Sequence, residues 1–221
     1  HHTDRRQRQM CIRDSFVEKS ICSSEFHHFR PFTSKDCDLW IDVNVLKCLD
    51  KRDDGLLIKG DSPADGQVGI FRTGGEPELI FDLLSNVFGI RLDDLPRVFE
   101  RASDFEGIRF MDPLVLFQSK CLCYLSLDQN GRQDQKHVRL LELIVPEHFR
   151  ELHEDAIAGE ITERQLIKEI KLLRKICNIA RVRRATKELG INPNELLPLD
   201  LLRGSELPLI RNFSASLKDS Y

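Results

Sequence analysis

Residues 36–43 (DCDLWIDV) constrain the fold more than any other stretch of the chain, because polar and apolar side chains alternate along them. The odd-numbered positions are apolar, whereas the even-numbered ones hold Asp36, Asp38, Trp40 and Asp42. Side chains two residues apart point to the same face of a β-strand. The pattern therefore predicts a strand with one face on a core and two carboxylates, Asp36 and Asp38, on the other.

The spacing of these two carboxylates suits a pair of metal ions. Two residues of strand span roughly 6–7 Å, from which flexible carboxylates converge on divalent cations about 3.5–4 Å apart. Such a metal pair activates a hydroxyl nucleophile and stabilises a departing phosphate. The alternative is that Asp36 and Asp38 line the solvent-exposed face of an ordinary edge strand. The Asp-x-Asp pattern by itself does not separate these two interpretations.

The composition indicates a globular protein with one medium-sized domain, or one domain with a helical addition. The chain has 221 residues and is 41% hydrophobic, which is enough for a packed core. Its formal net charge of -3 gives no overall positive field, so nucleic acid would need a local basic patch. The seven cysteines form no CxxC pair, so we expect reduced thiols rather than a disulfide framework.

The sequence carries no apparent membrane or export signal. No apolar run approaches the roughly 18–20 residues that span a bilayer. The N-terminus also lacks the charged-then-apolar order of a signal peptide. We therefore expect a cytoplasmic protein with no membrane partner.

The N-terminal residues need separate treatment. Residues 5–15 (RRQRQMCIRDS) resemble translated sequencing-adapter read-through, and position 1 is not Met. We expect residues 1–15 to be such an artefact, or else a disordered basic tail. If they are an artefact, the domain has lost whatever preceded Phe16.

Periodicity and turn residues predict an α+β domain over residues 16–146 and an all-helical region over 147–221. Residues 68–72 and 79–82 are expected to be strands, and a short helix ending at Gly89 is expected after the second. We expect a small sheet, mixed or antiparallel, flanked by helices.

A buried helix is expected from Pro113 to about Leu127, with Asp112 as its N-cap. It is apolar almost all round, which makes Lys120 conspicuous. The following helix should open at residues 132–137 and end before Pro146, which cannot donate to a helix hydrogen bond.

A capping box of Thr162 and Gln165 predicts another helix, over residues 163–190. This segment contains nine Lys or Arg residues and three Glu residues. It could bind an RNA backbone. The alternative is the solvent-exposed face of an amphipathic packing helix.

The order and spacing of five residues resemble the DNA polymerase β-type nucleotidyltransferase superfamily, and most closely its minimal, AbiEii toxin-like branch. The resemblance covers about residues 20–145. The run TSKDCDLW matches the Asp-x-Asp element, LIFDLL matches a third carboxylate on a later strand, and FQSK with RQDQKH matches a helix Lys followed by a charged element with an Asp. The five residues are Asp36, Asp38, Asp82, Lys120 and Asp134. As an alternative, Asp82 could simply cap a helix.

The resemblance implies Mg²⁺-dependent transfer of a nucleoside monophosphate from an NTP to a hydroxyl, with pyrophosphate released. Asp36 and Asp38 would hold two Mg²⁺ ions, and Asp82 would join one of them and could accept the acceptor's proton. Lys120 and Arg132 would bind the nucleotide, and Lys120 would offset phosphate charge. Asp134 would orient Lys120 or Arg132, or act as an acid or base toward the acceptor.

The resemblance departs from the family pattern at the phosphate-binding turn. Ser23 and Ser24 stand where the family has a Gly-Gly or Gly-Ser pair. Glycine lets backbone N–H groups approach a triphosphate closely, whereas serine would have to bind it through a side chain. Either loss of the native N-terminus or a degenerate turn accounts for the difference.

Several functional alternatives remain open. The acceptor could be tRNA, as in some toxin–antitoxin systems, which would imply an antitoxin protein as partner; protein and small-molecule acceptors are equally compatible with the residues. The chain could instead be a catalytically silent relative that binds RNA or a partner protein. A two-metal phosphohydrolase is a third possibility, although no His lies beside the Asp-x-Asp with ligand spacing.

Overall fold

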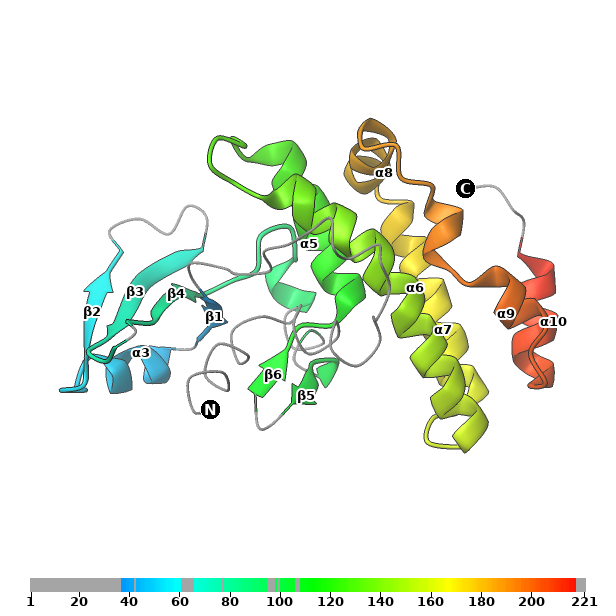
Figure 1. Ribbon diagram of the computed structural model, residues 1–221, viewed down its shortest axis with the longest axis horizontal. Helices are drawn as coiled ribbons and strands as arrows, with labels where there is room; N and C mark the ends of the chain where they lie inside the picture. The colour runs from blue at the N-terminus through cyan, green and yellow to red at the C-terminus, as the bar shows by residue number, and fades with distance from the viewer. Residues whose placement is uncertain are drawn as a thin grey trace. The chain divides into compact units, whose positions relative to one another are not determined.

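The computed structural model describes residues 37–41, 43–60, 66–76, 78–94, 98, 100–105 and 108–217. The chain forms two compact units, with the boundary between Phe110 and Met111. The first contains the sheet, and the second is helical (Figure 1). The expected α+β class, with a mixed sheet and an all-helical C-terminal region, is confirmed. Within the described residues, no helix has both the length and the apolar character that a membrane crossing requires.

A four-stranded mixed sheet organises the first unit. Its elements are β1 (Cys37–Trp40), α3 (Val43–Leu49), β2 (Gly55–Lys59), β3 (Gln67–Thr73) and β4 (Ile80–Leu84). The strand order is β1-β4-β3-β2, in which β1 runs parallel to β4 and the other pairs are antiparallel. The described residues of this unit also form a 3₁₀ turn, η2 (Leu92–Asp94), and a two-stranded sheet of β5 (Ser103–Phe105) and β6 (Ile108–Phe110).

One face of the four-stranded sheet packs on a small core beneath α3. Ile41, Phe71 and Leu83 are buried there, and Leu46 and Leu49 of α3 pack against them. Because side chains alternate along a strand, the opposite face carries the residues in between. The alternation predicted for residues 36–43 is confirmed over residues 38–41, where Asp38 and Trp40 are exposed, Leu39 is half-buried and Ile41 is buried. Asp36 and Asp42 lie outside the described residues.

The strands expected at 68–72 and 79–82 are present as β3 and β4. The short helix expected after the second strand was a wrong prediction, because no helix forms between β4 and Gly89. The chain instead makes a turn in which Ile90 N donates to Val87 O, and Gly89 takes a positive φ of 79°. Glycine adopts this backbone geometry without the steric cost that other residues incur.

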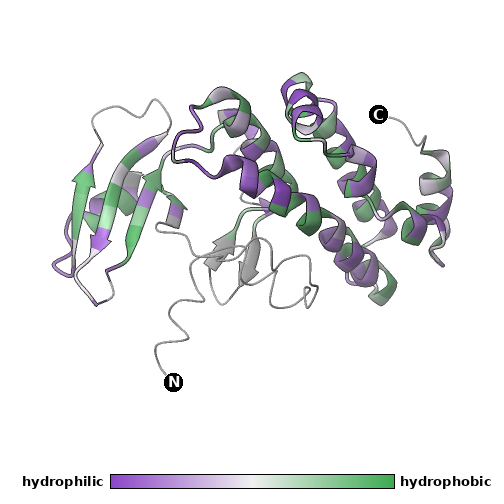
Figure 2. Ribbon diagram, turned by 45° about the horizontal axis from the view of Figure 1, so that its top comes forward, coloured by the Kyte–Doolittle hydropathy of each residue, from purple (hydrophilic) through white to green (hydrophobic). Residues whose placement is uncertain are grey.

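The second unit consists of packed helices. They are α5 (Pro113–Ser126), α6 (Asp134–Ala158), α7 (Glu163–Cys177), α8 (Ala180–Glu188), η3 (Pro193–Leu196), α9 (Leu199–Arg203) and α10 (Pro208–Ser216). The helix predicted at 113–127 is confirmed as α5, with the Asp112 carboxylate capping Leu114 N and Val115 N. The capping box of Thr162 and Gln165 is also confirmed. Helices of this unit carry hydrophobic and hydrophilic residues side by side (Figure 2).

Two helix boundaries differ from expectation. The helix expected to end before Pro146 continues as α6 to Ala158. Proline inside a helix costs about 3 kcal/mol, but Ile144, Val145 and Phe149 around it are at most 2% exposed, and their burial offsets that cost. The predicted helix over 163–190 is interrupted at Asn178.

The interruption at Asn178 has a local cause. Its side-chain amide donates to Arg174 O, and Ile179 N donates to Ile176 O in a tighter turn. An asparagine side chain that satisfies a terminal carbonyl competes with continuation of the helix. Val182 and Ala185 of α8 are fully buried, so the segment after the break still contributes an apolar face to the core.

Candidate functional site

Two of the predicted carboxylates are neighbours in the first unit. In the parallel ladder of β1 and β4, Asp38 lies opposite Asp82, one position from the pair Leu39 and Leu83. Because paired residues share a face, both carboxylates stand on the side of the sheet opposite the Leu83 core. Asp82 belongs to β4, so the alternative that it caps a helix was wrong.

The Asp82 carboxylate is held by a third strand. Gln67, the first residue of β3, donates from its side-chain amide to Asp82 Oδ1 over 2.7 Å. The register between β3 and β4 shifts between Gln67 and Gly69, and this irregularity accompanies the approach of Gln67 to Asp82. Irregularities of this kind redirect a side chain that a regular ladder would place elsewhere. No sequence pattern pointed to Gln67, because its contact with Asp82 depends on the register between β3 and β4.

Three further predicted residues come together in the second unit. Asp134, the first residue of α6, is only 2% exposed, and its Oδ2 lies 2.6 Å from Arg132 Nε. Its Oδ1 lies 3.6 Å from Lys120 Nζ on α5. A carboxylate in the first turn of a helix is also favoured by the helix dipole. Asp134 therefore contacts both cations, as an orienting carboxylate must, and that role stays a prediction.

Cys123 lies close to the same ion pairs. Burial raises the pKa of its thiol, and the positive charge of Lys120 opposes that shift only in part. A protonated thiol is a weak nucleophile. Cys123 thus fills space beside Lys120 rather than supplying an activated sulfur.

The remaining predicted residues fall outside the described part of the chain. They are Ser23, Ser24 and Asp36. The structure therefore brings together Asp38 with Asp82 in one unit, and Lys120 with Arg132 and Asp134 in the other. The phosphate-binding turn and the first carboxylate of the Asp-x-Asp element stay predictions.

The donor chemistry of the sheet pair suits a hard cation. Mg²⁺ prefers oxygen ligands and is commonly bound by one or two carboxylates together with substrate phosphates. Asp38 and Asp82 offer that donor type, and Asp38 is exposed. Across the described residues, no group of three His, Cys, Asp or Glu side chains is arranged to hold a metal ion. The pair thus has the donor chemistry for an ion whose other ligands would come from a substrate.

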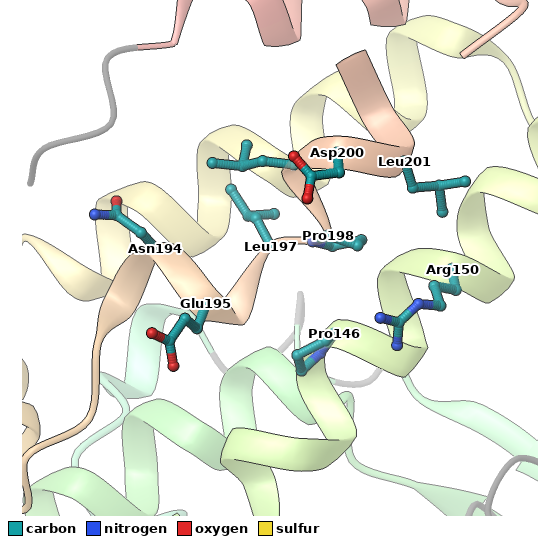
Figure 3. Close-up of a pocket in the computed structure, with 9 residues that line it drawn as sticks. Pro146, Arg150, Asn194, Glu195, Leu197, Pro198, Asp200 and Leu201 are labelled. Carbon is teal, nitrogen blue, oxygen red and sulfur yellow. The ribbon is translucent and has the colours of Figure 1, made fainter. Parts of the chain in front are cut away.

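A surface groove in the helical unit is the competing location for a ligand. It encloses about 350 Å³ between α6 and the η3–α9 segment, and Arg150, Glu195 and Asp200 lie around it (Figure 3). Arg150 pairs with Glu147, and Glu195 accepts a 2.9 Å hydrogen bond from Asn192 Nδ2. The groove lining contains no His, Cys or Ser. It therefore offers no imidazole, thiol or serine hydroxyl group.

No family model, curated protein or solved structure matches the chain.

Proposed function

We propose that this protein is a nucleotidyltransferase of the DNA polymerase β type, in the minimal, AbiEii toxin-like branch. It would move a nucleoside monophosphate from an NTP to an acceptor hydroxyl and release pyrophosphate. The observation that carries the proposal is the in-register placement of Asp38 and Asp82 on neighbouring parallel strands, on the face away from the core. The cytoplasm is the proposed location, and tRNA with an antitoxin partner is one proposed context.

The presence of Asp82 opposite Asp38 favours this function over the alternative that Asp38 lies on the solvent-exposed face of an ordinary edge strand. β1 is an edge of the four-stranded sheet, so Asp38 alone would suit a solvent-exposed position. Like charges directly opposite each other on adjacent strands are destabilising. Asp38 nevertheless lies opposite Asp82, and Gln67 donates to Asp82. The fold therefore contains this electrostatic repulsion at the candidate site. A cation bound there would remove the repulsion.

Mg²⁺ would be held by Asp38 and Asp82 together with Asp36, and when bound it would supply charge neutralisation and lower the pKa of the acceptor hydroxyl. Gln67 would keep the Asp82 carboxylate oriented through its 2.7 Å hydrogen bond. Phosphoryl transfer depends mostly on positioning and electrostatics, so an oriented carboxylate contributes directly to the rate. The roles proposed for Lys120, Arg132 and Asp134 are those that the resemblance implies.

Label transfer tests the proposal. Each of the four NTPs, labelled at the α-phosphate, is incubated with the protein, Mg²⁺ or Mn²⁺, and either total tRNA or a cell lysate. We expect one acceptor class to be labelled, and Asp38→Asn or Asp82→Asn to reduce labelling by about 10²-fold or more. Asp93→Asn is the matched control, because this carboxylate of the same unit is 85% exposed and pairs with Arg91.

The same experiment separates the alternatives. The missing glycine pair at Ser23 and Ser24 favours a silent RNA- or protein-binding relative. Such a protein would label no acceptor, and its Mg²⁺ affinity would not change in Asp38→Asn. A phosphohydrolase would release labelled nucleotide products without labelling an acceptor. Either result would contradict nucleotidyl transfer.

A further inference from the structure

The indole of Trp40 lies on the same sheet face as the carboxylate pair. Trp40 follows Asp38 by two residues on β1, so the two side chains point to the same side, separated by roughly 7 Å of strand. The residues between and after them, Leu39 and Ile41, belong to the opposite, core face. Core packing therefore does not account for a large aromatic side chain at position 40.

The indole is both exposed and anchored. Trp40 is 37% exposed, and its Nε1 donates a 2.9 Å hydrogen bond to Ser85 O at the end of β4. Ser85 is itself fixed, because its backbone N and its Oγ both donate to Gly66 O, over 2.8 Å and 3.1 Å. The polar edge of the ring is thus satisfied, and the ring is held to the strand that carries Asp82.

A flat aromatic surface of this kind suits a nucleobase. Every base has a π-face, and stacking on an aromatic side chain strengthens binding about 5- to 150-fold without reading the identity of the base. A ring that is already anchored loses little conformational freedom when a ligand stacks on it. In a nucleotide the sugar joins the base to the phosphates. A base beside Trp40 would therefore leave its phosphates near the Asp38 end of the same strand.

We propose that Trp40 is the stacking surface for the base of the NTP whose phosphates meet Asp38 and Asp82. This inference depends on the proposed function, and it adds how the nucleoside part of the substrate is bound. It also gives a specificity: all four NTPs bind, with the larger purines bound more tightly than the pyrimidines, because stacking grows with ring area.

The chain contains a single Trp, so its intrinsic fluorescence reports on this position without a label. The full chain is titrated with Mg²⁺·ATP and, separately, with Mg²⁺·tripolyphosphate, which has the phosphates but no base. We expect saturable quenching with ATP and little change with tripolyphosphate. Affinities are measured in parallel by equilibrium dialysis, which does not depend on the indole.

Three variants complete the test. Trp40→Leu should raise the Kd for Mg²⁺·ATP about tenfold and leave that for tripolyphosphate unchanged, whereas Trp40→Phe should retain most of the affinity because it keeps an aromatic face. Ile58→Ala is the matched control. Ile58 lies on the same sheet face as Trp40, and it is 43% exposed. It belongs to the cross-strand row of Ile70 and Asp82, but it stands on β2, at the far edge of the sheet. Its substitution should change neither Kd.

The outcomes are distinguishable. If the wild-type chain binds ATP and tripolyphosphate equally tightly, with no quenching by ATP, the stacking inference is overturned while the phosphate site stands. If neither ligand binds and no acceptor is labelled, the proposed function fails as well. Quenching of the wild-type protein by ATP alone supports the inference even if Trp40→Leu proves too unstable to purify.

Discussion

Gln67 Nε2 donates a 2.7 Å hydrogen bond to Asp82 Oδ1, and this contact joins the first residue of β3 to the carboxylate in the middle of β4. In the ladder between β3 and β4, the residue paired with Asp82 is Ile70. Gln67 reaches Asp82 only because the register shifts between Gln67 and Gly69. A side-chain contact that depends on a strand irregularity is of the kind that protein sites use to fix a functional group.

Gln67→Leu should weaken activity more than stability. The Gln67 amide orients the Asp82 carboxylate, and a misplaced catalytic group slows reaction, so we expect label transfer to fall about tenfold or more. The midpoint of urea unfolding should change little, because Gln67 is only partly buried. Unchanged transfer rates with wild-type stability would show that Gln67 does not position Asp82.

Asp134→Asn should destabilise the helical unit. Removing one partner of a buried pair leaves uncompensated charge, at a cost of 3–5 kcal/mol in fully buried cases. Lys120 and Arg132 keep 18% and 40% side-chain exposure, so water screens part of that loss and we expect about 2 kcal/mol. Urea unfolding measures it. Arg132→Gln serves as the comparison and should cost less than about 1 kcal/mol; equal losses would contradict a central role for Asp134.

The buried thiols predict a loss of stability at alkaline pH. Burial raises the pKa of Cys177 from 9.0 to about 12 and also raises the pKa of Cys121. Between pH 9.0 and about pH 12, the Cys177 thiol has lost its proton in the unfolded chain but keeps it in the folded chain. The free energy of unfolding therefore falls as pH rises through this range. At about pH 10 the loss from Cys177 should be about 1.4 kcal/mol.

Urea unfolding at about pH 7 and about pH 10 measures this loss, and the informative quantity is the difference between the two. Cys177→Ala should reduce the pH dependence even though it also lowers stability at both pH values. Cys48→Ala is the control, because Cys48 is an exposed thiol. If Cys177→Ala keeps the full wild-type pH dependence, groups other than Cys177 cause it.

A buried polar contact holds two distant parts of the helical unit together. His153 Nε2 lies 2.7 Å from Ser205 Oγ, and the two residues are 4% and 3% exposed. Ser205→Ala would remove the partner of a buried nitrogen, at a cost of about 1–3 kcal/mol. In a double-mutant cycle with His153→Phe, the combined loss should be smaller than the sum of the single losses. Additive losses would indicate that the contact contributes nothing specific.

An exposed serine supplies the control for that cycle. Ser216 is exposed and donates to Phe213 O within its own helix. Ser216→Ala should change the free energy of unfolding by less than about 0.5 kcal/mol.

Sequence patterns correctly predicted most of the elements for which the local signal and the tertiary packing favour the same secondary structure. The N-cap at Asp112 and the capping box at Thr162 are contained within a few residues, so they identified the starts of α5 and α7. The prediction that the helix ends before Pro146 was wrong for the converse reason. Local propensity disfavours Pro146, but the burial of Val145 and Phe149 outweighs it, and burial is a property of the assembled unit.

For the candidate site, local sequence patterns predicted which side chains share a face of the first strand. Alternation along residues 37–40 placed Asp38 and Trp40 on one face, because the two-residue period of a strand is local geometry. Only the tertiary structure placed Asp82 opposite Asp38 and Gln67 on Asp82. Strand order and register are set by the burial of the other face, around Leu83, and by contacts between residues far apart in the chain. No local pattern encodes them.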